Sequence, residues 1–348
     1  MSRKPGSSQV STTTTGVPPE STSSRSLRSG IVHLQHGLGY ASGSRHTAPC
    51  HNSRFAVAGQ AGAAGTGRMD AFVFDRDTAV RRVANGVWAG ELSSRWNAGT
   101  VPNGGYLMAI AGRMLCASVA CPDPLSLTGH YLQPAQPGPV TGQVELLRRG
   151  RRVSFAAVTL SQRGRGAIAR FTGVFGDLAQ QTGETRLEGV PPRLPPPVAC
   201  EPVEPVAIEV AKRFERRVAP GVGAWLGQGA DARAELCAWV RFADGRAQDA
   251  HSLALSADAL PPPLLAVYGA RGWTPTLELT VQIRARPAPG WLLCRTRTRY
   301  LTRGLLENDG EFWDEQGELV ALARQLARFA EPERPPLGLG DVPPSVSG

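Results

Sequence analysis

The chain has 348 residues, enough for about two domains, and 41% of them are apolar, which is ordinary for a protein that buries a core. No stretch approaches the eighteen or so continuous apolar residues that a membrane span needs, so we expect no transmembrane helix. The net charge of +9 is concentrated in residues 1–68, which carry +6 and leave +3 for residues 69–348. A nearly neutral body argues against nucleic-acid binding.

Residues 1–68 are rich in Ser, Thr, Gly and Arg and lack hydrophobic periodicity. Such a composition buries too little apolar surface to offset chain entropy, so we predict a disordered tail. The abundance of Arg and Ser is similar to that of a transit peptide. We favour a second explanation, in which the start codon is placed too far upstream and the protein begins at Met69.

From residue 69 to residue 180 the sequence predicts a hairpin, a buried helix and an antiparallel meander. Asn85-Gly86 is a hairpin turn signal inside an alternating segment. Residues 106–120 are apolar on nearly every face, which is typical of a buried helix. Four strand-like runs follow, separated by Pro-Gly and Gly-Arg turns.

A Pro-rich stretch without periodicity, residues 181–205, is predicted to be an extended linker. The same order of elements then returns in residues 206–331. Two strand-like runs come first, a helix is expected over Asp249–Leu260, and further strand-like runs follow. Residues 332–348 are predicted to be a flexible tail rich in Pro and Gly.

Two stretches of equal length carry the same pattern 152 residues apart. Leu127–Gly138 is LTGHYLQPAQPG, and Leu279–Gly290 is LTVQIRARPAPG. Each begins like a strand and ends in a Pro-Gly turn signal. We interpret the chain as two copies of one α+β unit, an antiparallel sheet around a central helix, in which the second copy covers the exposed side of the first copy's helix.

The order and the residues of the two copies resemble the double-hotdog, type-II (TesB-like) acyl-CoA thioesterases. PNGGYL, GHYLQPAQPG and VELLRRGRRVSFAAVTLSQRG carry the resemblance in the first copy, and ALSADAL, PTLELTVQIRARP and VALARQLARF carry it in the second. The resemblance implies an α+β tandem hotdog, with two antiparallel sheets each wrapped around a central helix. It also implies an acyl-CoA substrate and a homo-dimer or higher homo-oligomer.

The resemblance implies a catalytic trio of Asp258, Gln325 and Thr276 in the second copy. Thr280 lies four residues after Thr276 on the same predicted strand, and therefore on the same face, which makes it the alternative hydroxyl. A carboxylate can act as general base on a water molecule that amide and hydroxyl groups orient, so no covalent nucleophile is required. Pro261-Pro262-Pro263 must end or bend the helix that carries the aspartate.

Six further residues are candidates for substrate binding: Asn103, Gly104, Gly105, His130, Arg149 and Arg151. The first three lead into the buried helix, whose free amides could face the thioester carbonyl or a CoA group, or could simply start the helix. The histidine lies on a strand beside the helix end, where a half-buried structural role is the alternative. The two arginines flank a hairpin turn that could bind CoA phosphates or be merely solvated.

Several other chemistries lack their motifs. There is no GxSxG elbow, no Gly-rich phosphate loop and no hydratase string Y-x-x-G-D-x-N-P-x-H, and the six cysteines show no Cys-x-x-Cys spacing. We therefore predict a cytoplasmic enzyme that hydrolyses acyl-CoA to fatty acid and CoA without a metal or other cofactor. A non-catalytic acyl-CoA or lipid-binding hotdog protein is the alternative. A nucleic-acid or membrane-surface binder acting through the basic tail is a third.

Overall fold

The computed structural model describes residues 72–204, 207–222, 233–269 and 274–329. The chain divides into two units, residues 1–66 and 67–348, and every described residue belongs to the second unit. The tails predicted at residues 1–68 and 332–348 therefore lie outside the described residues. Within the described ranges, no helix is long and apolar enough to cross a membrane.

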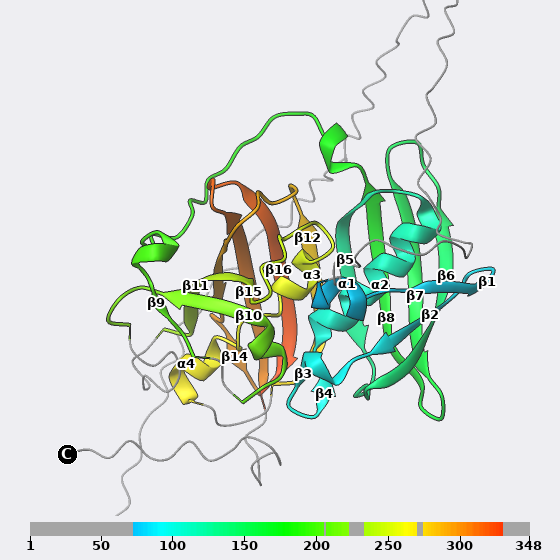
Figure 1. Cartoon of the computed structure of the whole chain (residues 1–348), viewed down its shortest axis with the longest axis horizontal. Helices are drawn as coiled ribbons and strands as arrows, with labels where there is room; N and C mark the ends of the chain where they lie inside the picture. The colour runs from blue at the N-terminus through cyan, green and yellow to red at the C-terminus, as the bar shows by residue number, and fades with distance from the viewer. Residues whose placement is uncertain (1–71, 205–206, 223–232, 270–273, 330–348) are drawn as a thin grey trace, which may run out of the picture. The chain divides into compact units, whose positions relative to one another are not determined.

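The first half is an antiparallel sheet with one long helix, α2 (Gly104–Val119), lying across it (Figure 1). In spatial order the strands are β1 (Arg81–Ala84), β2 (Val87–Leu92), β6 (Gly138–Arg148), β7 (Ser154–Gln162), β8 (Gly166–Gly176) and β5 (Asp123–Tyr131). A short helix, α1 (Val73–Asp77), and a two-residue ribbon of β3 (Asn97–Ala98) and β4 (Val101–Pro102) precede α2. The predicted hairpin and buried helix are confirmed. The predicted four-stranded meander holds for β6, β7 and β8 only, because β5 pairs with β8 rather than with β6.

The second half repeats this arrangement with shorter helices. Its strands follow the order β12 (Thr276–Ile283), β16 (Leu319–Arg328), β15 (Leu305–Asp314), β13 (Leu292–Arg297), β11 (Glu235–Phe242), β10 (Phe214–Val218) and β9 (Glu201–Pro202), and β14 (Leu301–Thr302) pairs with β15. The helices of this half are α3 (Leu253–Ser256) and α4 (Leu264–Tyr268). Of the 3-10 turns, η1 (Ser94–Trp96) lies in the first half, η2 (Leu178–Gln180) and η3 (Pro197–Ala199) lie between the halves, and η4 (Val210–Arg213) precedes β10.

The helix expected over Asp249–Leu260 is much shorter than predicted. Only the four residues of α3 are α-helical, and the next turns are closed by tighter bonds, from Asp258 N to Leu255 O and from Ala259 N to Ser256 O. The three prolines that follow have no N–H to donate, so a longer helix could not be continued. The aspartate therefore lies in the loosened turn just after α3.

The two halves share one continuous sheet, whereas two separate sheets were expected. β5 and β12 pair antiparallel, with Thr128 opposite Thr280 and their hydroxyl oxygens 2.9 Å apart. These two threonines are 152 residues apart, the same spacing as the sequence repeat. When a residue pairs with its own counterpart in the other copy, the axis relating the copies passes between the two residues. The pseudo-two-fold axis therefore passes between Thr128 and Thr280.

The register repeats beyond this pair. In the first half Leu127 pairs with Gly173, and in the second half Leu279 pairs with Gln325, again 152 residues later in both members. The two strands that join the halves also carry a register irregularity at the same place, between residues 124 and 126 in β5 and between residues 276 and 278 in β12. The second copy therefore preserves the strand geometry of the first residue by residue.

A buried arginine, paired with two half-buried carboxylates, ties the start of the first half to the segment before α3. Arg246 is 7% exposed and donates to both carboxylate oxygens of Asp75, at 2.8 and 2.9 Å, and to Asp249. Asp249 in turn accepts from the backbone N–H of Ser252, which caps α3. This contact helps to set α3 against the first half, where its last turn meets α2.

Candidate active site

The carboxylate of Asp258 lies at the N-terminus of α2, so the second half supplies the acid and the first half holds it. Asn103 caps α2 by accepting from the backbone N–H of Tyr106 at 3.0 Å, and its Nδ2 donates to Asp258 Oδ2 at 2.8 Å. The backbone N–H of Gly105 donates to the same oxygen at 3.0 Å. The positive end of α2 therefore faces a negative side chain.

Two glycines allow the two helices to come this close. A Cβ atom at Gly105 would lie 2.8 Å from Ala254 O and 2.9 Å from Asp258 Cβ, and a Cβ at Gly104 would lie 3.2 Å from Asp258 Oδ2. The contacts of Gly105 include backbone atoms of α3, which cannot move aside as a flexible side chain could. The Gly-Gly pair is thus required by the close approach of α3 to the start of α2.

The other two members of the predicted trio meet Asp258 on the inner face of the sheet, the face that carries the buried side chains of Leu279 and Val281. Gln325, 6% exposed, donates its Nε2 to Thr276 Oγ1 at 2.6 Å, and the same nitrogen lies 3.5 Å from Asp258 Oδ1. Oδ2 thus has two strong donors, whereas Oδ1 has only this long contact among the described residues. Oδ1 is the freer oxygen.

Thr280 does not belong with this group, and the prediction that it shares a face with Thr276 was wrong. The register irregularity between residues 276 and 278 inserts an extra residue, so Thr276 lies on the inner face opposite Ala327. The Thr280 hydroxyl points to the other face, where it contacts Thr128 and donates to Glu278 Oε1. Thr276 is therefore the hydroxyl beside Asp258 and Gln325.

The surroundings of Asp258 set its acidity. Burial raises the pKa of this carboxyl from its ordinary value of 3.8 to about 6, although hydrogen bonds from Gly105, Asn103 and Gln325 favour the charged form and limit the rise. A group with this pKa is largely ionised at pH 7 and is still basic enough to take a proton from a positioned water. The site therefore holds a carboxylate suited to general-base catalysis near neutral pH.

The remaining predicted residues lie elsewhere or have other partners. His130 is exposed on the outer face opposite Glu278. Arg149 and Arg151 are exposed in the β6–β7 turn, at the end of the sheet opposite Tyr131, about 25 Å along the strands. The amide of Gly105 and the carboxamide of Asn103 bind the aspartate rather than an open position.

Sequence reasoning missed two residues that contact the site. Tyr131, next to His130 but on the inner face, donates its hydroxyl to Gly104 O at 2.9 Å, and burial raises the pKa of that hydroxyl well above its usual value. Asn308 donates its Nδ2 to Gln325 Oε1 at 3.3 Å. Strand alternation could have pointed to Tyr131, but nothing in the sequence marked Asn308.

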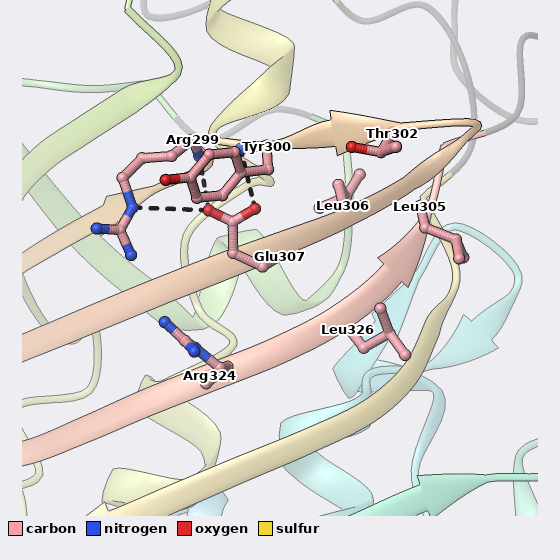
Figure 2. A pocket seen from close by; sticks show the side chains of 8 residues that line it. All are labelled: Arg299, Tyr300, Thr302, Leu305, Leu306, Glu307, Arg324 and Leu326. Carbon is pink, nitrogen blue, oxygen red and sulfur yellow. Dashed lines mark hydrogen bonds and ion pairs between the residues drawn. The ribbon is translucent and has the colours of Figure 1, made fainter. Parts of the chain in front are cut away.

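A pocket of about 280 Å³ lies against β14, β15 and β16 (Figure 2). It is lined by Arg299, Tyr300, Thr302, Leu305, Leu306, Glu307, Arg324 and Leu326. Arg324 and Leu326 flank Gln325 in the strand and therefore point away from it. None of the three residues of the predicted trio lines this pocket.

Comparison with known proteins identifies the family of the chain. The family model of the acyl-CoA thioesterase N-terminal domain matches residues 92–176, and that of the C-terminal domain matches residues 188–329. The chain belongs to the acyl-CoA thioesterase family. A candidate thioesterase II from Thermobifida fusca has 33% sequence identity and a TM-score of 0.70, with 76% of this chain and all of that chain covered.

Two more relatives extend the family comparison. A protein of unknown function with a hot dog fold, from Alicyclobacillus acidocaldarius, has 24% sequence identity and a TM-score of 0.67. The similarity covers 75% of the present chain and 99% of the Alicyclobacillus chain. An uncharacterized protein of Mycobacterium tuberculosis is 29% identical over 275 residues, which are 69% of this chain and 90% of that protein. The tandem hotdog prediction is confirmed.

Proposed function

We propose that the protein hydrolyses acyl-CoA thioesters to the free acid and CoA, with water as the nucleophile and Asp258 as general base. The observation that carries the proposal is the Asp258 carboxylate, held at Oδ2 by the α2 start, with Oδ1 beside the Gln325 nitrogen that also donates to Thr276. Membership of the acyl-CoA thioesterase family supports the substrate class. Hydrolysis of a panel of acyl-CoAs, followed by detection of the free thiol, tests it.

The hydrogen-bond directions assign a role to each group. Thr276 Oγ1 accepts from Gln325, so its own proton is available to a water or to the thioester oxygen. Asp258 Oδ1 takes a proton from the water as the water oxygen attacks the carbonyl carbon. The tetrahedral intermediate then breaks its C–S bond, and the proton passes from Asp258 to the departing sulfur. No bond to the protein forms at any step.

The pH dependence of kcat/KM should show the Asp258 titration. Below a pKa of about 6 the base is protonated, so activity should fall about tenfold for each further pH unit. Asn103→Ser keeps a capping side chain but removes the Nδ2 donor that favours the charged carboxylate, so the acid limb should move to higher pH. If activity falls off at the same acidic pH in both proteins, Asp258 is not the group that titrates.

The two candidate threonines allow a matched comparison on one strand. Thr276→Val removes the hydroxyl beside Gln325 and should lower kcat by about 10- to 100-fold. Thr280→Val removes a hydroxyl on the outer face and should leave kcat near the wild-type value. Steady-state hydrolysis of one acyl-CoA by both variants measures this difference, and equal losses would contradict the placement of the site.

A non-catalytic acyl-CoA-binding protein is the second candidate, because the fold alone does not require turnover. Tight binding of acyl-CoAs of several chain lengths, with no release of free CoA, would favour it. We also propose that the protein is cytoplasmic and forms a homo-dimer or higher homo-oligomer. Cell fractionation and light scattering test these two proposals.

A further inference from the structure

Asn308 is the partner of Gln325 on the neighbouring strand. β15 and β16 place the two residues directly opposite each other, so both side chains point to the inner face. Asn308 Nδ2 donates to Gln325 Oε1 at 3.3 Å, while Gln325 Nε2 faces Thr276 and Asp258. A carboxamide that turned over would present its oxygen to the Asp258 carboxylate and would accept from the Thr276 hydroxyl, so the Thr276 proton would no longer be available to the water.

The first half shows what the fold needs at these positions. Each of the three residues has a counterpart 152 positions earlier, at the same register in the first half. The counterpart of Asn308 is Ala156, that of Gln325 is Gly173 and that of Thr276 is Pro124. Ala156 is fully buried. The fold thus accepts apolar residues at these positions. Gln325 is buried and Asn308 half-buried, and polar groups removed from water are costly unless they are hydrogen-bonded, which favours a role for the pair that apolar residues cannot fill.

We propose that Asn308 is a positioning residue, which holds the Gln325 carboxamide so that its nitrogen faces Asp258 and Thr276. The inference rests on the proposed function and names a residue on which that site depends. Asn308 does not touch the reacting atoms. It keeps the Gln325 Nε2 donor directed at Thr276 and Asp258. The Thr276 proton and Asp258 Oδ1 are then both available to the water.

The test uses two substitutions of different character in the full chain. Asn308→Ala removes the donor and copies the first half, so the protein should fold while kcat falls about tenfold at little change in KM. Asn308→Asp is nearly isosteric but presents an acceptor, which should turn the Gln325 carboxamide around. We expect kcat to fall about a hundredfold and the acid limb of the pH profile to move upward, because a second negative charge opposes ionisation of Asp258.

Thr296→Val is the matched control. Thr296 lies on the same inner face, is 2% exposed, and has Val144 as its counterpart in the first half. Its kcat and pH profile should equal those of the wild type. A purely structural role for Asn308 predicts instead that Asn308→Ala, which adds no charge, loses melting temperature and keeps the wild-type pH profile in its folded fraction, and that result would overturn the inference.

A carbon NMR titration of the Asp258 carboxyl separates this inference from the proposed function. It needs no turnover, so it can be run even if the wild type hydrolyses none of the acyl-CoAs. A higher Asp258 pKa in Asn308→Ala, which adds no charge, than in the wild type and in Thr296→Val supports the coupling through Gln325. An unchanged pKa overturns the positioning role, whatever the activity of the enzyme.

Discussion

Asp258→Asn is expected to lower kcat/KM by about 10²–10⁴-fold, because it removes the general base and leaves the surrounding donors in place. The amide is nearly isosteric, and its oxygen can still accept from Gly105 and Asn103, so the loss should fall on kcat rather than on binding. Thiol release over a range of acyl-CoA concentrations up to saturation measures kcat and KM separately. Activity within threefold of the wild type would remove Asp258 from the mechanism.

The same substitution should make the protein more stable at pH 8. The pKa of Asp258 is about 6 in the folded chain and 3.8 is its ordinary value, so the folded state binds the extra proton between these pH values. Wild-type stability should therefore decrease as the pH rises from about 4 to 6, by at most about 3 kcal/mol. Asp258→Asn lacks this decrease and should unfold at higher urea concentration at pH 8, with the difference shrinking toward pH 4.

Gly105→Ala is expected to damage both stability and activity. The new methyl group would meet Ala254 O and the Leu255 backbone within 3.0 Å, so α3 must move away from the start of α2. Overpacking of this kind costs about 1–3 kcal/mol. A shift of the Asp258 carboxylate by about 1 Å can lower the rate about 100-fold. Urea unfolding and kcat/KM measure the two effects.

The control for this substitution is on the same helix. Gly112→Ala would bring its methyl group to 3.2 Å from Leu127 Cδ1, the tip of a side chain rather than backbone. Alanine is also favoured over glycine inside a helix by about 1 kcal/mol. Its activity should stay near the wild-type value. Equal losses in the two variants would mean that α2 tolerates neither substitution. The close contact of Gly105 with the backbone of α3 would then not be the cause of the loss.

The fold could be predicted from the sequence because each copy carries its own recognisable pattern of strands and turns. The 152-residue spacing of two similar strands is visible in the letters, and it is the spacing that places Thr128 opposite Thr280. That the two strands pair with each other is not visible, because pairing depends on which edges the chain leaves open. Two separate sheets were therefore expected where one continuous sheet forms.

The site was predicted in part, for reasons that differ from residue to residue. The Thr276–Thr280 error comes from strand alternation, which assumes a regular strand and cannot detect an inserted residue. The partner of the Gly105 amide could not be found, because Asp258 is 153 residues away along the chain. Asn308 was missed because its meaning appears only when the halves are compared at equal register.

Hydrolysis in ¹⁸O-labelled water under single-turnover conditions tests the central claim most directly. With enzyme in excess over an acyl-CoA, direct attack by a water bound at Asp258 places one ¹⁸O atom in the free acid and none in the protein. Mass spectrometry of the acid and of the peptide that contains Asp258 measures both. Label in the Asp258 carboxyl would mean that the aspartate attacked the thioester itself, and the mechanism argued above would be wrong.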